Sequence, residues 1–169
     1  QIKEGDKLTV SLRKDIGEKD MDEIFLPEIF YDRQDVMIKG VRDFLQKFEN
    51  VKRYRNYYFR NSFPIKIISE LLNKSSMTLK ELPSSAKISI KRDKVSVPIR
   101  ISMDNDLMEI IGLYIAEGYL RKNSSKKGFY QISIAGNETI RKIVKKVFYS
   151  HFGLKPSYEN KDQVVFSSR

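Results

Sequence analysis

A glutamate at the end of an apolar segment is the side chain in this sequence best placed to do chemistry. Asp104 is a good helix N-cap, and the residues after it can form a helix that runs to about Ala116 and leaves through Gly118. Glu117 then lies at the negative end of the helix dipole, which disfavours an acid by roughly 0.3–1 kcal/mol. A basic neighbour such as Arg121, or a bound cation, would offset that cost. Glu117 is therefore either a solvated surface residue or a cation ligand.

Two small residues share one face of the same segment. Gly112 and Ala116 lie four positions apart, so both point to the same side of a helix. Small side chains at that spacing let the backbone of another helix approach closely. Ordinary core packing would use them equally well, so spacing alone leaves both interpretations open.

The composition excludes several classes of chemistry. The 169 residues include no cysteine, which removes disulfides, cysteine-ligated zinc, iron–sulfur clusters and a thiol nucleophile. His151 is the one histidine, which excludes a multi-histidine metal cage and any Ser-His-Asp chemistry without it. No apolar run approaches the roughly 20 residues that cross a bilayer, and no signal peptide opens the chain. We expect a cytoplasmic protein, and the start at Gln1 suggests a piece of something longer.

Positive charge is concentrated in the middle of the chain. The formal net charge is +10, and residues 37–100 alone hold 15 basic and 5 acidic side chains. Such an excess is either a solvated basic surface or a footprint for nucleic-acid phosphates. The basic-aromatic run 52–60 contains three candidate DNA contacts, Arg53, Arg55 and Arg60. That run is either a DNA-contacting loop or a strand whose tyrosines pack on the core.

The elements that must position Glu117 are the most legible part of the chain. The expected order is a helix, two strands, a helix and two strands, over residues 104–116, 119–123, 129–135, 138–152, 158–160 and 163–167. Asn137 caps the second helix and Gly153 ends it.

The first part of the chain is expected to mix short elements. They are a turn and strand over 1–12, a connector over 13–35, helices over 36–48, 64–73 and 78–82, and a β-hairpin over 87–99. Ser62 is the expected cap of the second of these helices, with Pro64 in its first turn. Two helices and a turn over residues 62–82 also leave open an unrelated helix-turn-helix regulator.

Residues 110–118, Ile-Ile-Gly-Leu-Tyr-Ile-Ala-Glu-Gly, resemble the LAGLIDADG motif of homing endonucleases, in the archaeal intein variant with Glu in place of the second Asp. Residues 119–122 (Tyr-Leu-Arg-Lys), the αββαββ order and the Val-Phe-Ser-Ser ending at 165–168 are similar to the first half of that fold. Residues 3–8 (Lys-Glu-Gly-Asp-Lys-Leu) resemble a strand late in the amino-terminal splicing block of an intein. The resemblance covers residues 101–169 well and 1–12 loosely.

The resemblance implies an α+β fold in three parts. Residues 101–169 would be an αββαββ LAGLIDADG half-domain. Residues 17–100 would be a linker and a basic, mostly helical accessory region that binds DNA. Residues 1–16 would be the short β remnant of a Hint-like splicing domain.

The same resemblance implies an activity and a site. The protein would be an intein-encoded, site-specific double-strand DNA endonuclease that uses Mg²⁺. Glu117 would be the metal ligand and the catalytic acid, and Gly112 and Ala116 would be the positions where two motif helices cross. Mg²⁺ takes one or two carboxylates together with phosphate and water oxygens, so cysteine and several histidines are not needed.

The family reads DNA with the concave face of its sheet, so the resemblance implies DNA contacts on that face here. Strand alternation buries Leu120, Ile132 and Ile134 and turns the neighbouring side chains toward DNA. The expected contacts, to base edges and to phosphates, are Tyr119, Arg121, Lys122, Asn123, Lys126, Lys127, Gln131 and Ser133. An ordinary solvated strand face is the alternative for these polar positions.

The chain departs from the family pattern in three ways. It has one motif copy, it stops before the helix that should close the half-domain, and it lacks the splicing nucleophile at position 1 and a terminal His-Asn pair. We therefore expect no splicing, and a second acid supplied by a missing carboxy-terminal half or by a homodimer copy. A catalytically inactive DNA- or RNA-binding module, as in a degenerate intein insert or a maturase-like splicing cofactor, is the alternative function.

Overall fold

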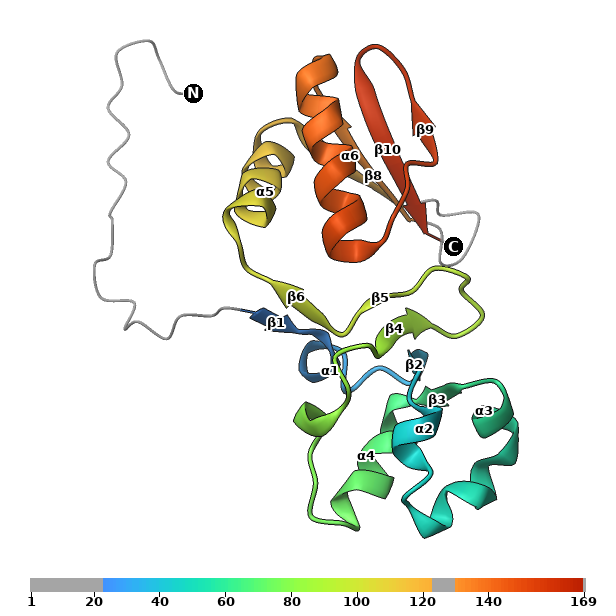
Figure 1. Cartoon of the computed structure of the whole chain (residues 1–169). Helices are drawn as coiled ribbons and strands as arrows, with labels where there is room; N and C mark the ends of the chain where they lie inside the picture. Colours follow the sequence, from blue (N-terminus) through green and yellow to red (C-terminus); the bar gives the residue numbers. More distant parts are fainter. Residues whose placement is uncertain (1–22, 123–129, 169) are drawn as a thin grey trace, which may run out of the picture.

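Two lobes with separate hydrophobic cores make up the part of the chain that the structure describes. The structure is a computed structural model that describes residues 23–122 and 130–168. The first lobe, residues 23–99, lies below the second lobe, residues 105–168, in Figure 1. Each core is drawn from its own lobe, so the two lobes are separate packing units.

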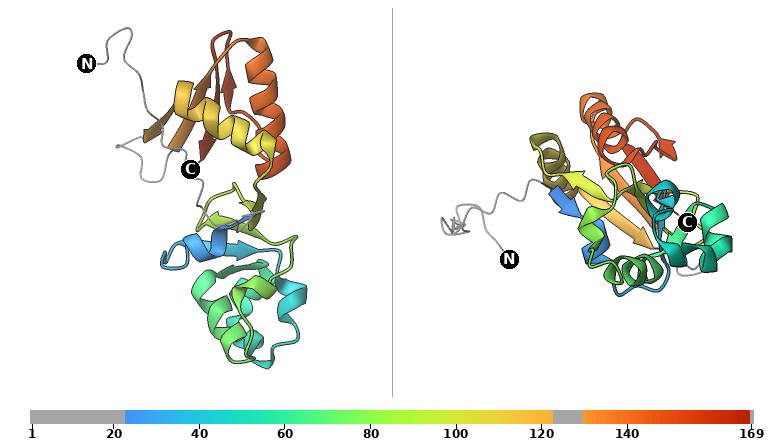
Figure 2. Two further views of the ribbon diagram at one scale, coloured as in Figure 1. Left: turned by 90° about the vertical axis from the view of Figure 1, so that its left-hand side faces the viewer. Right: turned by 60° about the horizontal axis from the view of Figure 1, so that its bottom comes forward.

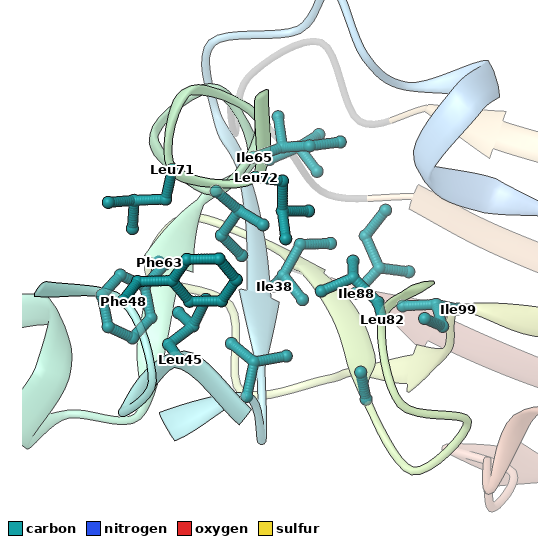
Figure 3. Packing of buried hydrophobic residues seen from close by; sticks show 14 of the residues in the cluster. Ile38, Leu45, Phe48, Phe63, Ile65, Leu71, Leu72, Leu82, Ile88 and Ile99 are labelled. Atoms are coloured by element: carbon teal, nitrogen blue, oxygen red, sulfur yellow. The ribbon is translucent and has the colours of Figure 1, made fainter. Parts of the chain in front are cut away.

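The first lobe is built on a four-stranded antiparallel sheet of order β3-β2-β4-β5. Its elements are β1 (Glu23–Phe25), α1 (Leu26–Ile29), β2 (Val36–Lys39), α2 (Arg42–Leu45), η1 (Glu49–Tyr54), α3 (Arg55–Phe59), β3 (Ser62–Pro64), α4 (Ile65–Asn73), η2 (Leu79–Glu81), β4 (Lys87–Ile90) and β5 (Val97–Pro98). Ile38 and Phe63 of the sheet pack against Leu45 and Leu72 in the core, as Figure 3 shows.

The second lobe is an antiparallel sheet of order β7-β8-β10-β9 with α5 and α6 packed on it. Its elements are α5 (Asn105–Glu117), β7 (Gly118–Lys122), β8 (Tyr130–Ala135), α6 (Glu138–Phe152), β9 (Tyr158–Glu159) and β10 (Gln163–Ser168). Phe148 of α6 stacks on Phe166 of β10 with ring centroids 3.9 Å apart. The expected αββαββ order and the mixed α and β character are therefore present.

A two-stranded ribbon joins the lobes. Strand β6 (Arg100–Ser102) leads into α5 and pairs antiparallel with β1. Helix α6 also packs against β5 and β6, so it touches the ribbon and the edge of the first sheet (Figures 1 and 2). Arg100 reinforces the ribbon through an ion pair with Glu23 and a cation–π contact with the ring of Phe25.

The helix caps in the second lobe are confirmed. The carboxylate of Asp104 accepts from the N–H of Leu107 at 2.9 Å, and the side chain of Asn137 accepts from the N–H of Ile140 at 3.0 Å. Gly153 ends α6 in the left-handed conformation, with φ of 67°. These local signals fix the positions of both helices.

The predicted helix over residues 36–48 is wrong in its first part. Val36–Lys39 is strand β2, which pairs with both β3 and β4, and Gly40 at φ of 77° then turns the chain into the four-residue helix α2. The helical spacing of the apolar residues is overridden by pairing with distant strands. The first lobe therefore combines several short helices with a sheet that extends beyond the expected hairpin over 87–99.

Two further expectations for the first lobe are corrected. Ser62 lies in β3 and caps nothing, because Pro64 is the N-cap of α4. Residues 78–82 form only the three-residue 3₁₀ turn η2, whose capping box joins Thr78 and Glu81. A turn this short gives no recognition helix, so the helix-turn-helix alternative loses its structural basis.

None of the helices within the described ranges is both long enough and apolar enough to span a bilayer. The expected strand near residues 1–12 and the splicing remnant 1–16 lie outside the described residues.

Candidate functional site

The helix α5 passes into strand β7 without an intervening loop, and Gly118 makes this possible. Its N–H donates to the carbonyl of Tyr114. A Cβ at Gly118 would lie 2.5 Å from that carbonyl oxygen and 2.3 Å from Cδ2 of the same tyrosine, which is closer than atoms can approach. The glycine therefore fixes the direction in which Glu117 leaves the helix.

Glu117 is exposed at the carboxyl end of α5. Within residues 23–122 and 130–168 its carboxylate has no hydrogen-bond or ion-pair partner, Arg121 included. The helix dipole disfavours its charge there, and no described side chain offsets that cost. A cation from outside the chain could do so.

The outward face of α5 is apolar and uncovered by any described residue. Met108 is 50% exposed and Ile115 is 79% exposed, and Gly112 and Ala116 lie on the same side. No atom lies within 4 Å of where a Cβ of Gly112 would stand. These positions follow helical spacing, so they form one stripe, which we call the α5 stripe. Core packing within the described chain, the alternative for Gly112 and Ala116, does not occur.

The sheet face opposite α5 and α6 carries four of the predicted DNA-reading residues. The register aligns Tyr119 with Ser133 and Arg121 with Gln131. Tyr119 is 54% exposed and Arg121 is exposed, while Gln131 is half-buried and donates to Oγ of Ser167 at 3.2 Å. Arg and Gln side chains can make bidentate contacts to base edges, so the face suits DNA.

Two of the strand predictions need correction. Ser133 lies on the predicted face but is 3% exposed, and its hydroxyl donates to Oε1 of Gln163 at 2.6 Å, so it is not open to a ligand. Leu120 lies on the helix side yet is 56% exposed, because β7 is the edge strand of the sheet. The buried assignment is confirmed for Ile134, at 1% exposed.

Several predicted phosphate contacts fall where the structure is not described. Asn123, Lys126 and Lys127 lie outside the described residues. Lys122 is the last residue of β7, and only its backbone is described.

The basic-aromatic run of the first lobe is helical, which neither interpretation of it foresaw. Arg53 lies in η1, Arg55 opens α3, and Arg60 follows α3 directly; all three are exposed. The guanidinium of Arg55 stands 5.3 Å from the ring centre of Phe59, which is 66% exposed. The run therefore forms an exposed basic surface with an aromatic ring in it.

Two contacts that the sequence did not reveal hold the site in place. His151 Nε2 lies 2.9 Å from both carboxylate oxygens of Asp104, which ties the end of α6 to the start of α5. The Leu107 N–H, and secondarily His151, hold the pKa of Asp104 below its ordinary value.

The second contact is Arg141, a buried cation in α6. Its guanidinium donates to Glu159 and to the carbonyls of Gly136 and Lys161, and so joins α6 to the β9–β10 turn. The side chain of Lys145, and then Arg141, lower the pKa of Glu159. The basic residues of this helix, Arg141 with Lys142, Lys145 and Lys146, are expected from the sequence on its solvated face, and for Arg141 that expectation is wrong because this residue is only 9% exposed.

Metal ligands are not clustered in the described part of the chain. Across residues 23–122 and 130–168, no group of three or more His, Asp or Glu side chains could hold a metal ion. The described residues thus offer one carboxylate, that of Glu117, at the end of the motif helix.

The comparisons with known proteins give one relative and no family. The chain is 28% identical over 183 aligned residues to a DNA polymerase II large subunit from Thermococcus kodakarensis. The match takes in all of this chain and 10% of the polymerase subunit, so the chain spans about a tenth of that relative's length. No protein-family model matches the chain.

Proposed function

We propose that the chain supplies one half of a metal-dependent, site-specific DNA endonuclease of the LAGLIDADG homing type, encoded within an intein. The observation that carries the proposal is the end of α5. There an exposed carboxylate without a partner in the described residues, Glu117, lies directly after the uncovered α5 stripe. A structural helix would bury that stripe or carry polar side chains on it.

The α5 stripe suits a second motif helix, from another copy of the chain or from a carboxy-terminal half. Gly112 and Ala116 would let the two backbones approach, while Met108 and Ile115 would be buried at the contact. The pairing would bring a second acid beside Glu117.

One carboxylate from each half fits Mg²⁺, which completes its shell with waters and phosphate oxygens. Bound Mg²⁺ would supply a more acidic attacking water and stabilise the charge that develops on the phosphate. The chain's own residues hold and orient the duplex. Tyr119, Arg121 and Gln131 would face the bases from the open side of the sheet.

The similarity to a DNA polymerase subunit supports this proposal. An insert within a host polymerase would match along its whole length and would cover a small part of the larger protein, as found here. The organism of that relative also agrees with the archaeal intein variant of the motif.

An inactive DNA- or RNA-binding module on the same scaffold is the second candidate. It is favoured by the single carboxylate that the described residues place at the end of α5. Binding by the sheet face and the basic first lobe would persist without cleavage.

Cleavage of a defined duplex separates the two candidates. The intact protein that contains this chain is incubated in Mg²⁺ with plasmid that carries an uninterrupted gene for a DNA polymerase II large subunit, and a parallel reaction contains EDTA. We expect one double-strand break that EDTA suppresses. Retention of the plasmid in gel shifts, with no break in Mg²⁺ or Mn²⁺, would favour the binding module.

A further inference from the structure

A basic hollow lies on the first lobe, away from α5. It has a volume of about 270 Å³ and opens between α3, β2 and the turn after β4. Met37 and Ser89 form its floor; they are register partners, on the sheet face opposite the core residues Ile38 and Ile88.

The rim of the hollow is strongly cationic. Lys39, Arg60, Lys91 and Arg92 line it, with Asp93 as the one acidic residue. The ammonium of Lys39 donates to the backbone carbonyl of Asp93 at 3.2 Å, which holds this cation at the rim. Four positive charges around so small a hollow favour a compact anion.

Two features of the hollow lower the stability of the folded chain. Ser89 is 7% exposed, and in the described part of the chain its buried hydroxyl has no hydrogen-bond partner. Arg92 has φ of 70°, in the left-handed region that favours glycine. Strain of this kind collects at ligand sites, where the conformation serves binding. An anionic oxygen in the hollow would give the hydroxyl an acceptor.

A backbone hydrogen bond and an ion pair support the rim of the hollow within the first lobe. The N–H of Lys91 donates to the carbonyl of Asp35 at 2.6 Å, and the Asp35 carboxylate pairs with Arg33 at 2.8 Å. The backbone of the rim is therefore tied to the segment that leads into β2.

We propose that this hollow binds a backbone phosphate of duplex DNA, so that the first lobe grips the same molecule that the sheet of the second lobe reads. The proposal rests on the proposed function in taking DNA as the partner. Lys39 and Arg60 hold the phosphate from two sides, and the Arg92 turn presents a third positive charge.

The test is a salt titration of duplex affinity with the whole chain. The variant Lys39→Gln/Arg60→Gln removes two charges at the rim. The control Lys74→Gln/Lys155→Gln removes two exposed charges that have no hydrogen-bond or ion-pair partner in the described residues. A lost phosphate contact lowers the slope of log K against log salt by about 0.9. We expect that reduction in the rim variant only.

A second variant tests whether a change in slope reflects the lost charge or a loss of folding. Arg92→Gly removes one rim charge and relieves the positive φ, so it should not destabilise the chain and should still flatten the slope. Inorganic phosphate, followed by the backbone amide signals of residues 89–92, tests whether the hollow takes a free anion. Slopes equal to the control in both rim variants overturn the proposal, even if inorganic phosphate shifts those signals. No duplex binding by the unmodified chain would instead refute the proposed function.

Discussion

Gly112 within α5 and Gly118 directly after that helix are under opposite steric constraints. Gly118 stands where a side chain would overlap the backbone of Tyr114, so its lack of a Cβ is a requirement of the helix-to-strand turn. Gly112 faces open space in the described chain. A glycine in a helix interior costs about 0.5–1 kcal/mol relative to alanine, and nothing in residues 23–122 and 130–168 explains Gly112.

Alanine substitutions at these two glycines should therefore act in opposite directions. Gly118→Ala should lower the free energy of unfolding by about 1–3 kcal/mol, because backbone atoms must move to admit the methyl group. Gly112→Ala should raise it by about 0.5–1 kcal/mol through helix propensity. Urea unfolding of both variants in dilute solution measures this. Equal effects would mean that Gly118 does not determine the turn.

At the scale of elements, α6 is the fixed support against which α5 and the sheet are placed. Its end contacts Asp104 through His151, and its buried Arg141 joins the β9–β10 turn to the start of the helix. Hydrogen bonds to a charged group contribute about 1.5–3 kcal/mol each where the group is shielded from water. The position of the open sheet face of the second lobe thus depends on one buried cation.

Arg141→Met should destabilise the second lobe by about 2–4 kcal/mol, since the carbonyls of Gly136 and Lys161 lose a buried donor. Lys142→Met is the matched control. Lys142 forms an exposed ion pair with Glu138, which should contribute at most about 0.5 kcal/mol to the free energy of unfolding. Chemical denaturation compares the two, and a loss no larger than in the control would contradict a supporting role for Arg141.

The second lobe could be predicted element by element because its signals are local. Asp104, Asn137 and Gly153 mark helix ends through contacts within one turn of chain. Strand β2 could not be predicted in this way, because the apolar spacing of residues 37–48 fits a helix. Only pairing with the distant strands β3 and β4 makes its residues a strand. Gly40 was the one local feature that argued against a continuous helix, because a residue with positive φ interrupts a helix.

The candidate site also has parts that the sequence predicts and parts that it does not. Glu117 at a helix end, next to a required glycine, follows from the sequence. The exposure of Ile115 and the burial of Ser133 could not be predicted from the sequence. The periodicity of a helix or strand shows on which side of the element a residue lies, but not which other residues cover that side. The hydroxyl of Ser133 is withdrawn from the open face by Gln163, a partner 30 positions away.

At the scale of the whole molecule, the proposed function assigns the two lobes different parts in holding DNA. The first lobe carries much of the positive charge, whereas the second carries the open polar sheet face and the α5 stripe. The stripe needs a partner, and the proposed partner is a second motif helix. Assembly and function are therefore expected to fail together.

Pairing through the stripe predicts a specific assembly defect. Gly112→Leu adds a side chain at the closest approach and should abolish self-association while leaving helix content intact, because leucine is a good helix former. Lys142→Leu adds the same side chain on an exposed face of α6 and should associate as the unmodified chain does. Sedimentation velocity decides between them. Equal association of the two variants would exclude the stripe as the contact.

The central claim is that Glu117 holds the metal used for cleavage, and the most direct measurement is cleavage by Glu117→Gln. Glutamine keeps the size and polarity of the side chain but removes the charge that binds Mg²⁺. The control is Glu109→Gln, an exposed acid on the same helix. We expect Glu117→Gln to lose double-strand cleavage in Mg²⁺ while keeping duplex affinity in Ca²⁺, and Glu109→Gln to cut normally. Full double-strand cleavage by Glu117→Gln would contradict the assignment.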